Sequence, residues 1–224
     1  MLKLDNIHKS YGKSKILNGS TFEINKGDHI GIIGGNGCGK TTLIKILCGI
    51  MSPDKGQILN GGKPVAKSDF KYLMGYLPQN NPLIEELTVK DNLKLWFSSM
   101  DIKFKNNPII EKLGVDGFLN KNVNKLSGGM KRRVSLCIAM ANEAPILVMD
   151  EPTTALDLVA KGEIWQLLED YKKNGGTVVV TTHDYDEINR CSRLMLMEKG
   201  VLNEIENNMP YEKIIRKLIG NSGE

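Results

Sequence analysis

The sequence has 224 residues, and its 30 Lys and Arg against 26 Asp and Glu give a net charge of +4. This mild excess of basic residues does not by itself indicate nucleic-acid binding, and we expect no nucleic-acid partner. No stretch reaches the roughly 20 apolar residues that a membrane-spanning helix needs. The first residues lack the apolar core of a signal peptide, so nothing suggests export of this chain. The length suits one domain, with room for two lobes.

The four cysteines, Cys38, Cys48, Cys137 and Cys191, form no Cys-x-x-Cys pair. The three histidines do not cluster with them, so we do not expect a zinc site. Thiols of this kind indicate a protein of the reducing cytosol.

The first predicted element is a small antiparallel sheet. Apolar side chains alternate with polar ones at residues 2–7, a turn follows at 11–13, and strand-like residues continue over 16–24. A short apolar run at 30–33 then suits a buried strand. A Gly-rich loop and a helical pattern at 43–48 follow this strand directly.

Further along the chain, strands alternate with helices. Residues 146–149 and 178–181 are short apolar runs typical of buried strands. The pattern at 158–173 predicts a helix that ends before the glycines at 175 and 176. This alternation predicts a parallel α/β sheet.

Between about residues 80 and 143 the pattern becomes helical, so we expect a helical insertion into the sheet core. The predicted helices of this insertion cover residues 89–100, 109–113 and 130–141. After residue 201 the sequence predicts one more strand and a helix at 210–219, where Pro210 suits the first turn.

Residues 34–41, Gly-Gly-Asn-Gly-Cys-Gly-Lys-Thr, match the pattern G-x-x-x-x-G-K-[ST]. The glycines let backbone N–H groups converge on phosphate oxygens, and the following helix adds its positive N-terminal end. Lys40 can donate a charge-assisted hydrogen bond to the outer phosphates, and the Thr41 hydroxyl can ligate Mg²⁺. The alternatives are a chance match in a Gly-rich loop and a dinucleotide site, although the latter has no use for Lys-Thr here.

An acidic pair ends the predicted strand at 146–149. Asp150 at the tip of a buried strand is costly unless a cation lies beside it, so we expect it to hold Mg²⁺, through water. Glu151 then stands where a general base could polarise the attacking water. The alternative is a solvated strand end followed by a turn at Pro152.

Residues 126–130, Leu-Ser-Gly-Gly-Met, resemble the Leu-Ser-Gly-Gly-Gln signature of the ATP-binding-cassette (ABC) ATPases and stand between the phosphate loop and the acidic pair, as in that family. Ser127, Gly128 and Gly129 would present a hydroxyl, N–H groups and a helix N-terminus to a γ-phosphate. Taken alone, the same residues would be an ordinary helix cap.

Other segments match the family residue by residue. Gln79 looks like the glutamine that touches the metal or the lytic water and links the site to the membrane subunit. Residues 154–157 resemble the segment that spans the dimer interface, and His183 resembles the histidine that contacts the γ-phosphate. Tyr11 resembles the aromatic residue that stacks on adenine. A lone histidine or tyrosine is otherwise commonly structural.

The resemblance covers essentially the whole chain and implies a fold and a set of site residues. The fold is an α/β P-loop NTPase (RecA-like) core with a small N-terminal antiparallel β subdomain and an inserted α-helical subdomain. The chain would be a single ABC ATPase domain, with its core lobe at about 1–79 and 144–224 and its helical subdomain at about 80–143. Glu151, His183 and Gln79 would be catalytic. ATP would contact Tyr11, Gly34, Asn36, Gly37, Cys38, Gly39, Lys40, Thr41, Thr42, Ser127, Gly128 and Gly129, and Mg²⁺ would contact Thr41, Gln79 and Asp150.

The resemblance also implies a function: the ATP-binding and ATP-hydrolysing subunit of an ABC transporter. Its partners would be an integral membrane permease, docked on Gln79 and residues 80–96, and a second ATPase subunit in a homodimer or heterodimer. Its location would be cytoplasmic, peripherally bound to the inner face of the cell membrane. Met130 replaces the usual Gln, and with the basic residues 131–133 it resembles the ATPases of two-part exporters. We expect this basic run itself to be a solvated helix face.

Two other functions stay open. The first is an ABC ATPase of DNA repair, chromosome upkeep or translation, but such proteins usually carry long coiled-coil insertions or two cassettes, and this sequence has neither. The second is a nucleotide-binding scaffold with little turnover, against which Glu151 and His183 argue.

Overall fold

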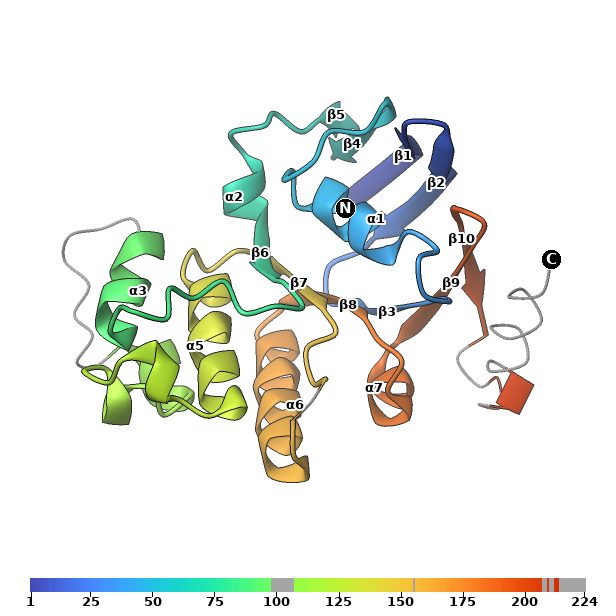
Figure 1. Cartoon of the computed structure of the whole chain (residues 1–224). Helices are drawn as coiled ribbons and strands as arrows, with labels where there is room; N and C mark the ends of the chain where they lie inside the picture. The colour runs from blue at the N-terminus through green and yellow to red at the C-terminus, as the bar shows by residue number, and fades with distance from the viewer. Residues whose placement is uncertain (98–106, 155, 207–208, 210–211, 214–224) are drawn as a thin grey trace.

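The computed structural model describes residues 1–97, 107–154, 156–206, 209 and 212–213 (Figure 1). Residues 98–100 of one predicted helix, residue 155 of the segment 154–157, and nearly all of the predicted helix at 210–219 lie outside the described residues.

The N-terminal part of the chain forms an antiparallel sheet with the strand order β2-β1-β4-β5. Its strands are β1 (Leu2–Tyr11), β2 (Ser14–Ile24), β4 (Lys55–Asn60) and β5 (Lys63–Pro64). The β1–β2 hairpin turns at Gly12, whose φ of 58° lies in the left-handed region that glycine adopts freely. Leu2, Leu4 and Ile7 are all buried, as the sequence predicts, and a shift in register between Leu4 and Ile7, where Asn6 has a φ of 54°, lets all three share one core cluster.

The main sheet has six strands in the order β10-β9-β3-β8-β7-β6. Every neighbouring pair is parallel except β10 and β9. Its strands are β3 (His29–Ile33), β6 (Met74–Leu77), β7 (Ile146–Asp150), β8 (Thr177–Thr181), β9 (Arg193–Glu198) and β10 (Val201–Ile205). The central strands β3, β7 and β8 are buried on both faces, which explains their continuous apolar runs. The carboxyl ends of β3, β6, β7 and β8 therefore meet at one edge.

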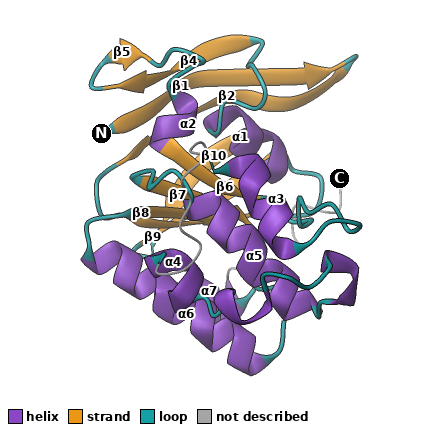
Figure 2. Cartoon of the chain, turned by 90° about the vertical axis from the view of Figure 1, so that its left-hand side faces the viewer, coloured by secondary structure: helices purple, strands orange, loops and turns teal. Residues whose placement is uncertain are grey.

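Two helices cover opposite faces of the main sheet (Figures 1 and 2). Helix α1 (Lys40–Leu47) lies between the main sheet and the antiparallel sheet, and its Leu43 and Ile44 belong to a core cluster that both sheets share. Helix α6 (Leu158–Lys173) packs its Ile164 against the other face, in a second core cluster. Asp157 caps α6 by accepting a hydrogen bond from the N–H of Ala160 at 2.9 Å.

The segment between β6 and β7 is helical, as predicted. It contains α3 (Val89–Trp96), α4 (Pro108–Lys112), α5 (Gly128–Met140) and the 3₁₀ turns η1 (Asp116–Phe118) and η2 (Val123–Lys125). The remaining helices are α2 (Phe70–Leu73) and α7 (Tyr185–Arg190). None of the helices in the described ranges combines the length and the apolar character needed to span a bilayer.

The sequence does not predict strands β4, β5, β6 and β9. Strand β6 illustrates the reason, because its four residues include Gly75 and show no clear alternation. A Cβ at Gly75 would lie 2.1 Å from the carbonyl oxygen of Ala139. The glycine therefore permits the end of α5 to approach the strand closely, which is a tertiary requirement.

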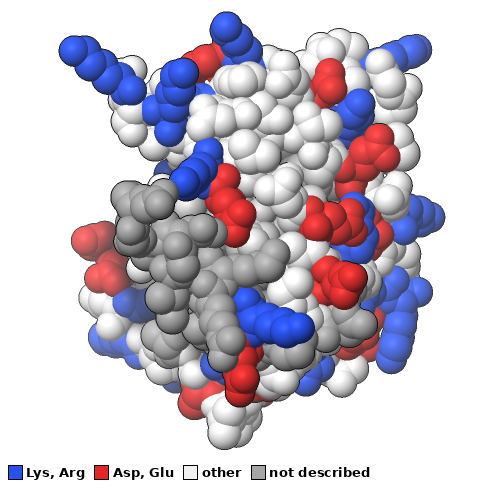
Figure 3. All heavy atoms as spheres, turned by 90° about the vertical axis from the view of Figure 1, so that its right-hand side faces the viewer, with Lys and Arg blue, Asp and Glu red and all other residues white. Residues whose placement is uncertain are grey.

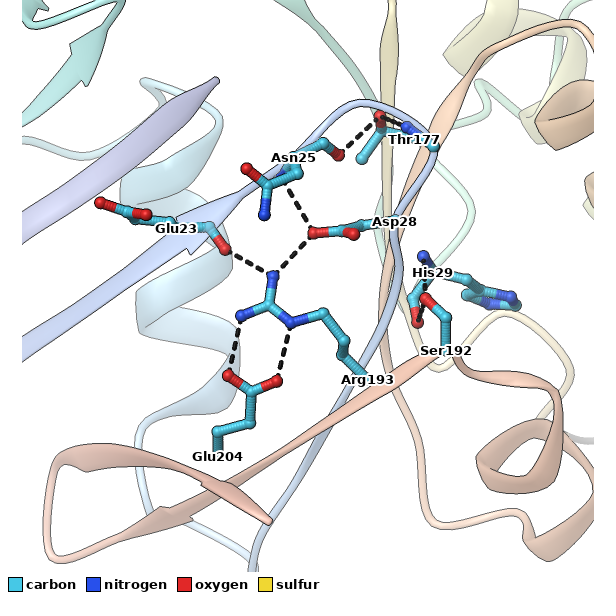
Figure 4. A network of polar contacts seen from close by, with 9 residues as sticks. Glu23, Asn25, Asp28, His29, Thr177, Ser192, Arg193 and Glu204 are labelled. Atoms are coloured by element: carbon cyan, nitrogen blue, oxygen red, sulfur yellow. Dashed lines mark hydrogen bonds and ion pairs between the residues drawn. The ribbon is translucent and has the colours of Figure 1, made fainter. Parts of the chain in front are cut away.

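Arg193, the first residue of β9, connects the edge strand β10 with the turn before β3 (Figure 4). Its guanidinium donates to both carboxylate oxygens of Glu204 on β10 at 2.8 Å each, to Asp28 at 2.7 Å and to the carbonyl of Glu23 at 2.9 Å. The two carboxylates raise the pKa of Arg193, mainly through the hydrogen bonds to Glu204. This network ties β9 and β10 to the turn that leads from β2 into β3.

Charged side chains of both signs are interspersed among the described residues on the face that contains β10 (Figure 3). This distribution agrees with the small net charge of +4.

Candidate functional site

The loop at residues 34–39 joins the carboxyl end of β3 to the start of α1. Gly37 and Gly39 have φ values of 74° and 112°, which a side chain would disfavour. A Cβ at Gly39 would also lie 3.1 Å from the carbonyl oxygen of Ile16. These glycines allow the tight turn that aims the start of α1 at the sheet edge.

The start of α1 offers backbone N–H groups and a positive charge that can bind an anion. Gly39 provides no side-chain cap, so the first N–H groups of the helix remain available for a ligand. Lys40 is buried at the first position of α1, and its ammonium donates to the carbonyls of Gly34 at 2.7 Å and Gly35 at 3.1 Å. The loop thus holds a positive charge beside free backbone donors, which suits a polyphosphate.

A cavity of about 450 Å³ opens beside this loop. It connects the phosphate loop with the segments that follow β6 and β7. The residues that line it are Ile16, Asn36, Gly37, Gly39, Lys40, Thr41, Thr42, Gln79 and Glu151. The structure therefore brings most of the predicted phosphate contacts together with the predicted catalytic Gln79 and Glu151.

Three predicted catalytic side chains meet where β6, β7 and β8 end. The amide of Gln79 donates to Oε2 of Glu151 at 3.0 Å, and Nε2 of His183 lies 3.6 Å from its Oε1. The hydroxyl of Thr154 also donates to Oε2 of Glu151, at 3.2 Å. Glu151 has a left-handed backbone, with a φ of 48°, which is uncommon for a non-glycine residue.

Asp150 lies one residue before Glu151 and is almost fully buried at the end of β7. Its Oδ1 accepts a hydrogen bond from the hydroxyl of Thr181, its partner in the register of β7 and β8. Thr181 is not predicted as a site residue from the sequence, because only the strand register places it beside Asp150.

His183 follows β8 directly and faces both Lys40 and Glu151. Burial lowers the pKa of its imidazole, the positive charge of Lys40 lowers it further, and the carboxylate of Glu151 opposes them. The pKa lies below the ordinary 6.5, so the ring is neutral at pH 7. A neutral ring can donate one hydrogen bond to a phosphate while its other nitrogen accepts.

The prediction that the basic run forms a solvated helix face is wrong for Arg132. Its side chain is only 4% exposed, whereas its neighbours form ion pairs at the surface, Lys131 with Glu85 and Arg133 with Glu163. Burial lowers the pKa of Arg132 to about 10, so the guanidinium still carries its charge at pH 7. The reason for its burial is tertiary, since the segments after β6 and β7 cover it.

The predicted signature residues begin α5. Ser127 is the N-cap, and its hydroxyl accepts a hydrogen bond from the N–H of Met130 at 3.3 Å. The ordinary helix cap considered in the sequence analysis is therefore present. Ser127, Gly128 and Gly129 are not among the residues that line the cavity at the phosphate loop. Within one chain, the structure does not bring the signature residues to that cavity.

Three further predicted nucleotide contacts, Tyr11, Gly34 and Cys38, also do not line the cavity. Tyr11 is half-exposed, and its hydroxyl donates to the sulfur of Met51 at 3.3 Å. Cys38 is partly buried in the phosphate loop, and burial raises the pKa of its thiol. A Cβ at Gly34 would lie 2.6 Å from Sγ of Cys38, so the thiol packs against the loop backbone.

A Gly-rich loop before a helix, a buried lysine and an acidic cluster at the carboxyl edge of a parallel sheet define a P-loop nucleoside triphosphatase. The sequence profile described as "ABC transporter" matches residues 17–154. The chain belongs to the ABC transporter family and is an ATPase of that family.

Curated relatives agree with this assignment. The chain is 35% identical to the Nod factor export ATP-binding protein I of Paraburkholderia xenovorans over 89% of this chain and 68% of that protein. It is 32% identical to the linearmycin resistance ATP-binding protein LnrL of Bacillus subtilis over 89% of this chain and 67% of that protein.

Solved structures show the same fold. A bacterial ABC transporter cassette, solved as a dimer, superposes with a TM-score of 0.82 and 28% identity, covering 93% of this chain and 99% of that one. The same cassette, in a post-hydrolysis state with ADP and phosphate bound, superposes equally well.

Proposed function

We propose that this ATPase drives export through a separate membrane permease, and that Glu151 is the general base of ATP hydrolysis. The observation that carries the proposal is the cluster of Gln79, Glu151 and His183 beside the phosphate loop. Glu151 and Lys40 line the same cavity, so a water held between them could lose a proton to the carboxylate of Glu151. His183 would donate to the γ-phosphate as charge develops there.

Nucleotide binding is assigned mainly to the phosphate loop. The ammonium of Lys40 would leave the carbonyls of Gly34 and Gly35 for the phosphate oxygens, while the N–H groups of Thr41 and Thr42 point from the uncapped helix. We assign the backbone of Asn36, Gly37, Cys38 and Gly39 to the same phosphates, and Tyr11 to the adenine ring.

The donor set near the loop suits Mg²⁺. A hydroxyl, an amide oxygen and a buried carboxylate are oxygen ligands of the kind that Mg²⁺ prefers. We therefore assign Thr41, Gln79 and Asp150 to Mg²⁺, which when bound would neutralise charge on the phosphates.

The signature residues are assigned to a second copy or a close relative of this chain. They do not line the chain's own cavity, yet they begin a helix whose N-terminus could face a phosphate. In a head-to-tail pair, Ser127, Gly128 and Gly129 of one chain would cover the ATP held by the other. The dimeric state of the similar bacterial cassette supports this arrangement.

The permease would dock in a groove of about 530 Å³ between α1, α2, β6 and the end of α5. Pro78, Pro82 and Trp96 line it, so it adjoins Gln79 and the helical segment. Ile50 and Trp96 are large apolar side chains that remain at least half-exposed at its edge. A short amphipathic helix of the permease fits this chemistry.

The export direction rests on the relatives, which are named for Nod factor export and linearmycin resistance. We further propose that the protein lies on the inner face of the cell membrane. Its core lobe would cover about 1–79 and 144–224, with a helical subdomain at about 80–143.

The test is capture of the partner. A tagged Glu151→Gln variant, made in the native cell, is purified from membranes with ATP and Mg²⁺. We expect an integral membrane protein to co-purify in a complex that depends on ATP. The matched control adds Lys40→Ala to the same variant, which should abolish the ATP dependence. Recovery of only soluble proteins or nucleic acid would overturn the transport proposal.

A further inference from the structure

Arg132 lies on α5 five residues after Ser127 and reaches the ends of two strands of the main sheet. All five of its hydrogen-bond acceptors are backbone carbonyls. Its Nε donates to Pro152 at 2.8 Å, its Nη1 to Pro78 at 2.7 Å and Gln79 at 3.2 Å, and its Nη2 to Asp150 at 3.2 Å and Glu151 at 2.9 Å.

The acceptors fall into two groups. Pro78 and Gln79 follow β6, and residues 150–152 end or follow β7, its parallel neighbour. A planar guanidinium can bridge these segments because its five N–H groups diverge in a fixed fork. Burying a cation is costly, so the site is stable only while the carbonyls stay in place around it.

The hydrogen bond from Arg132 to the carbonyl of Glu151 helps to fix the backbone of that residue. The left-handed backbone of Glu151 persists only if its surroundings hold it. Its N–H donates to the carbonyl and the hydroxyl of Thr181, at 3.1 Å each, and its carbonyl accepts from Arg132. The peptide groups on both sides of the residue are thus fixed, which sets the direction of its carboxylate.

We propose that Arg132 is a positioning residue for hydrolysis, which holds the backbones of Gln79 and Glu151 at the spacing that their side chains need. The inference rests on the proposed role of Glu151 as the base. It also means that the position of the base depends on α5, the helix that begins with the signature residue Ser127. Arg132 itself does not line the cavity at the phosphate loop.

The test compares Arg132→Met with Arg133→Met in the full chain. Arg132→Met removes the guanidinium that bridges the two groups of carbonyls. Arg133→Met removes a surface ion pair of the same helix. For each variant, kcat and KM for Mg-ATP, the Kd of a fluorescent ATP analogue and the thermal midpoint are measured. We expect kcat of Arg132→Met to fall about 100-fold, because a small misplacement of a reacting group can cost that much. The Kd should change less than twofold, and Arg133→Met should match the wild type.

Arg132→Lys keeps the charge but cannot reach both groups of carbonyls. Its kcat should therefore lie between that of Arg132→Met and that of the wild type. If Arg132→Met does not fold, Arg132→Lys decides: a kcat at least fivefold below the wild type with unchanged Kd supports the inference. A folded Arg132 variant with wild-type kcat, or with kcat and ATP affinity reduced together, overturns it. Glu151→Gln separates the two proposals, because normal turnover of that variant would instead refute the assignment of the base.

Discussion

The side-chain amide of Gln79 donates a hydrogen bond to the carboxylate of Glu151 over 3.0 Å, although the two residues are 72 positions apart. Thr154 donates to the same oxygen, while His183 faces the other one. The carboxylate of Glu151 is therefore held at the cavity wall by these three side chains. A base of this kind needs both a fixed direction and access to water.

Replacing Glu151 by Gln should nearly abolish turnover, because the amide cannot accept the proton of the attacking water. ATP binding should persist, since the phosphate loop is unchanged. Steady-state hydrolysis and equilibrium ATP binding check both parts. Glu86→Gln, at an exposed position, is the matched control. Turnover at the wild-type rate in Glu151→Gln would remove Glu151 from the base role.

Replacing Lys40 by Ala should weaken ATP binding, because a charge-assisted hydrogen bond to phosphate contributes about 1.5–3 kcal/mol. That energy corresponds to a rise in Kd of roughly 10- to 100-fold. Isothermal titration with ATP measures it, and Lys63→Ala on the exposed strand β5 is the control for loss of a positive charge. An unchanged Kd would contradict the role of Lys40.

Removing His183 should lower kcat by about 10²–10³ if the imidazole stabilises developing charge on the γ-phosphate. The pKa of His183 is below 6.5, so the neutral ring persists at pH 7, and protonation should affect the rate only below pH 6.5. A pH–rate profile of wild type and His183→Ala checks this, with His8→Ala as the control. A loss below tenfold would favour a structural histidine.

The free energy of unfolding should fall as the pH drops below 6.5, because His29 is buried and its pKa is lowered to about 4, mainly by burial. The charge of Lys172 lowers the pKa as well, the charge of Glu169 raises it, and Arg190 contributes in both directions. The unfolded chain takes up the proton first, so stability is full above pH 6.5 and decreases down to about pH 4. The loss amounts to about 3 kcal/mol.

Urea unfolding at several pH values measures this slope in wild type and in His29→Gln, where it should become shallower. His8→Gln is the matched control for the loss of an imidazole. An identical slope in His29→Gln would assign the pH dependence to other groups.

The fold was largely predictable because its signals are local. Buried parallel strands such as β7 and β8 are continuous apolar runs, and α6 has a cap at one end and glycines at the other. The missed strand β6 carries no such local signal. It forms because Gly75 lets α5 approach and because β7 offers hydrogen bonds along its edge.

Some features of the site can likewise be predicted from the sequence, and others cannot. The sequence by itself determined the phosphate loop and the acidic pair, because backbone approach to phosphate requires glycines and a lysine within a few residues. Only the tertiary structure decided that Thr181 bonds Asp150 and that Arg132 is buried while Arg133 is not. These contacts join segments that meet through strand register and helix packing. The spacing of residues along the chain does not predict these contacts, because they depend on how the strands of the sheet pair and on how α5 packs against the sheet.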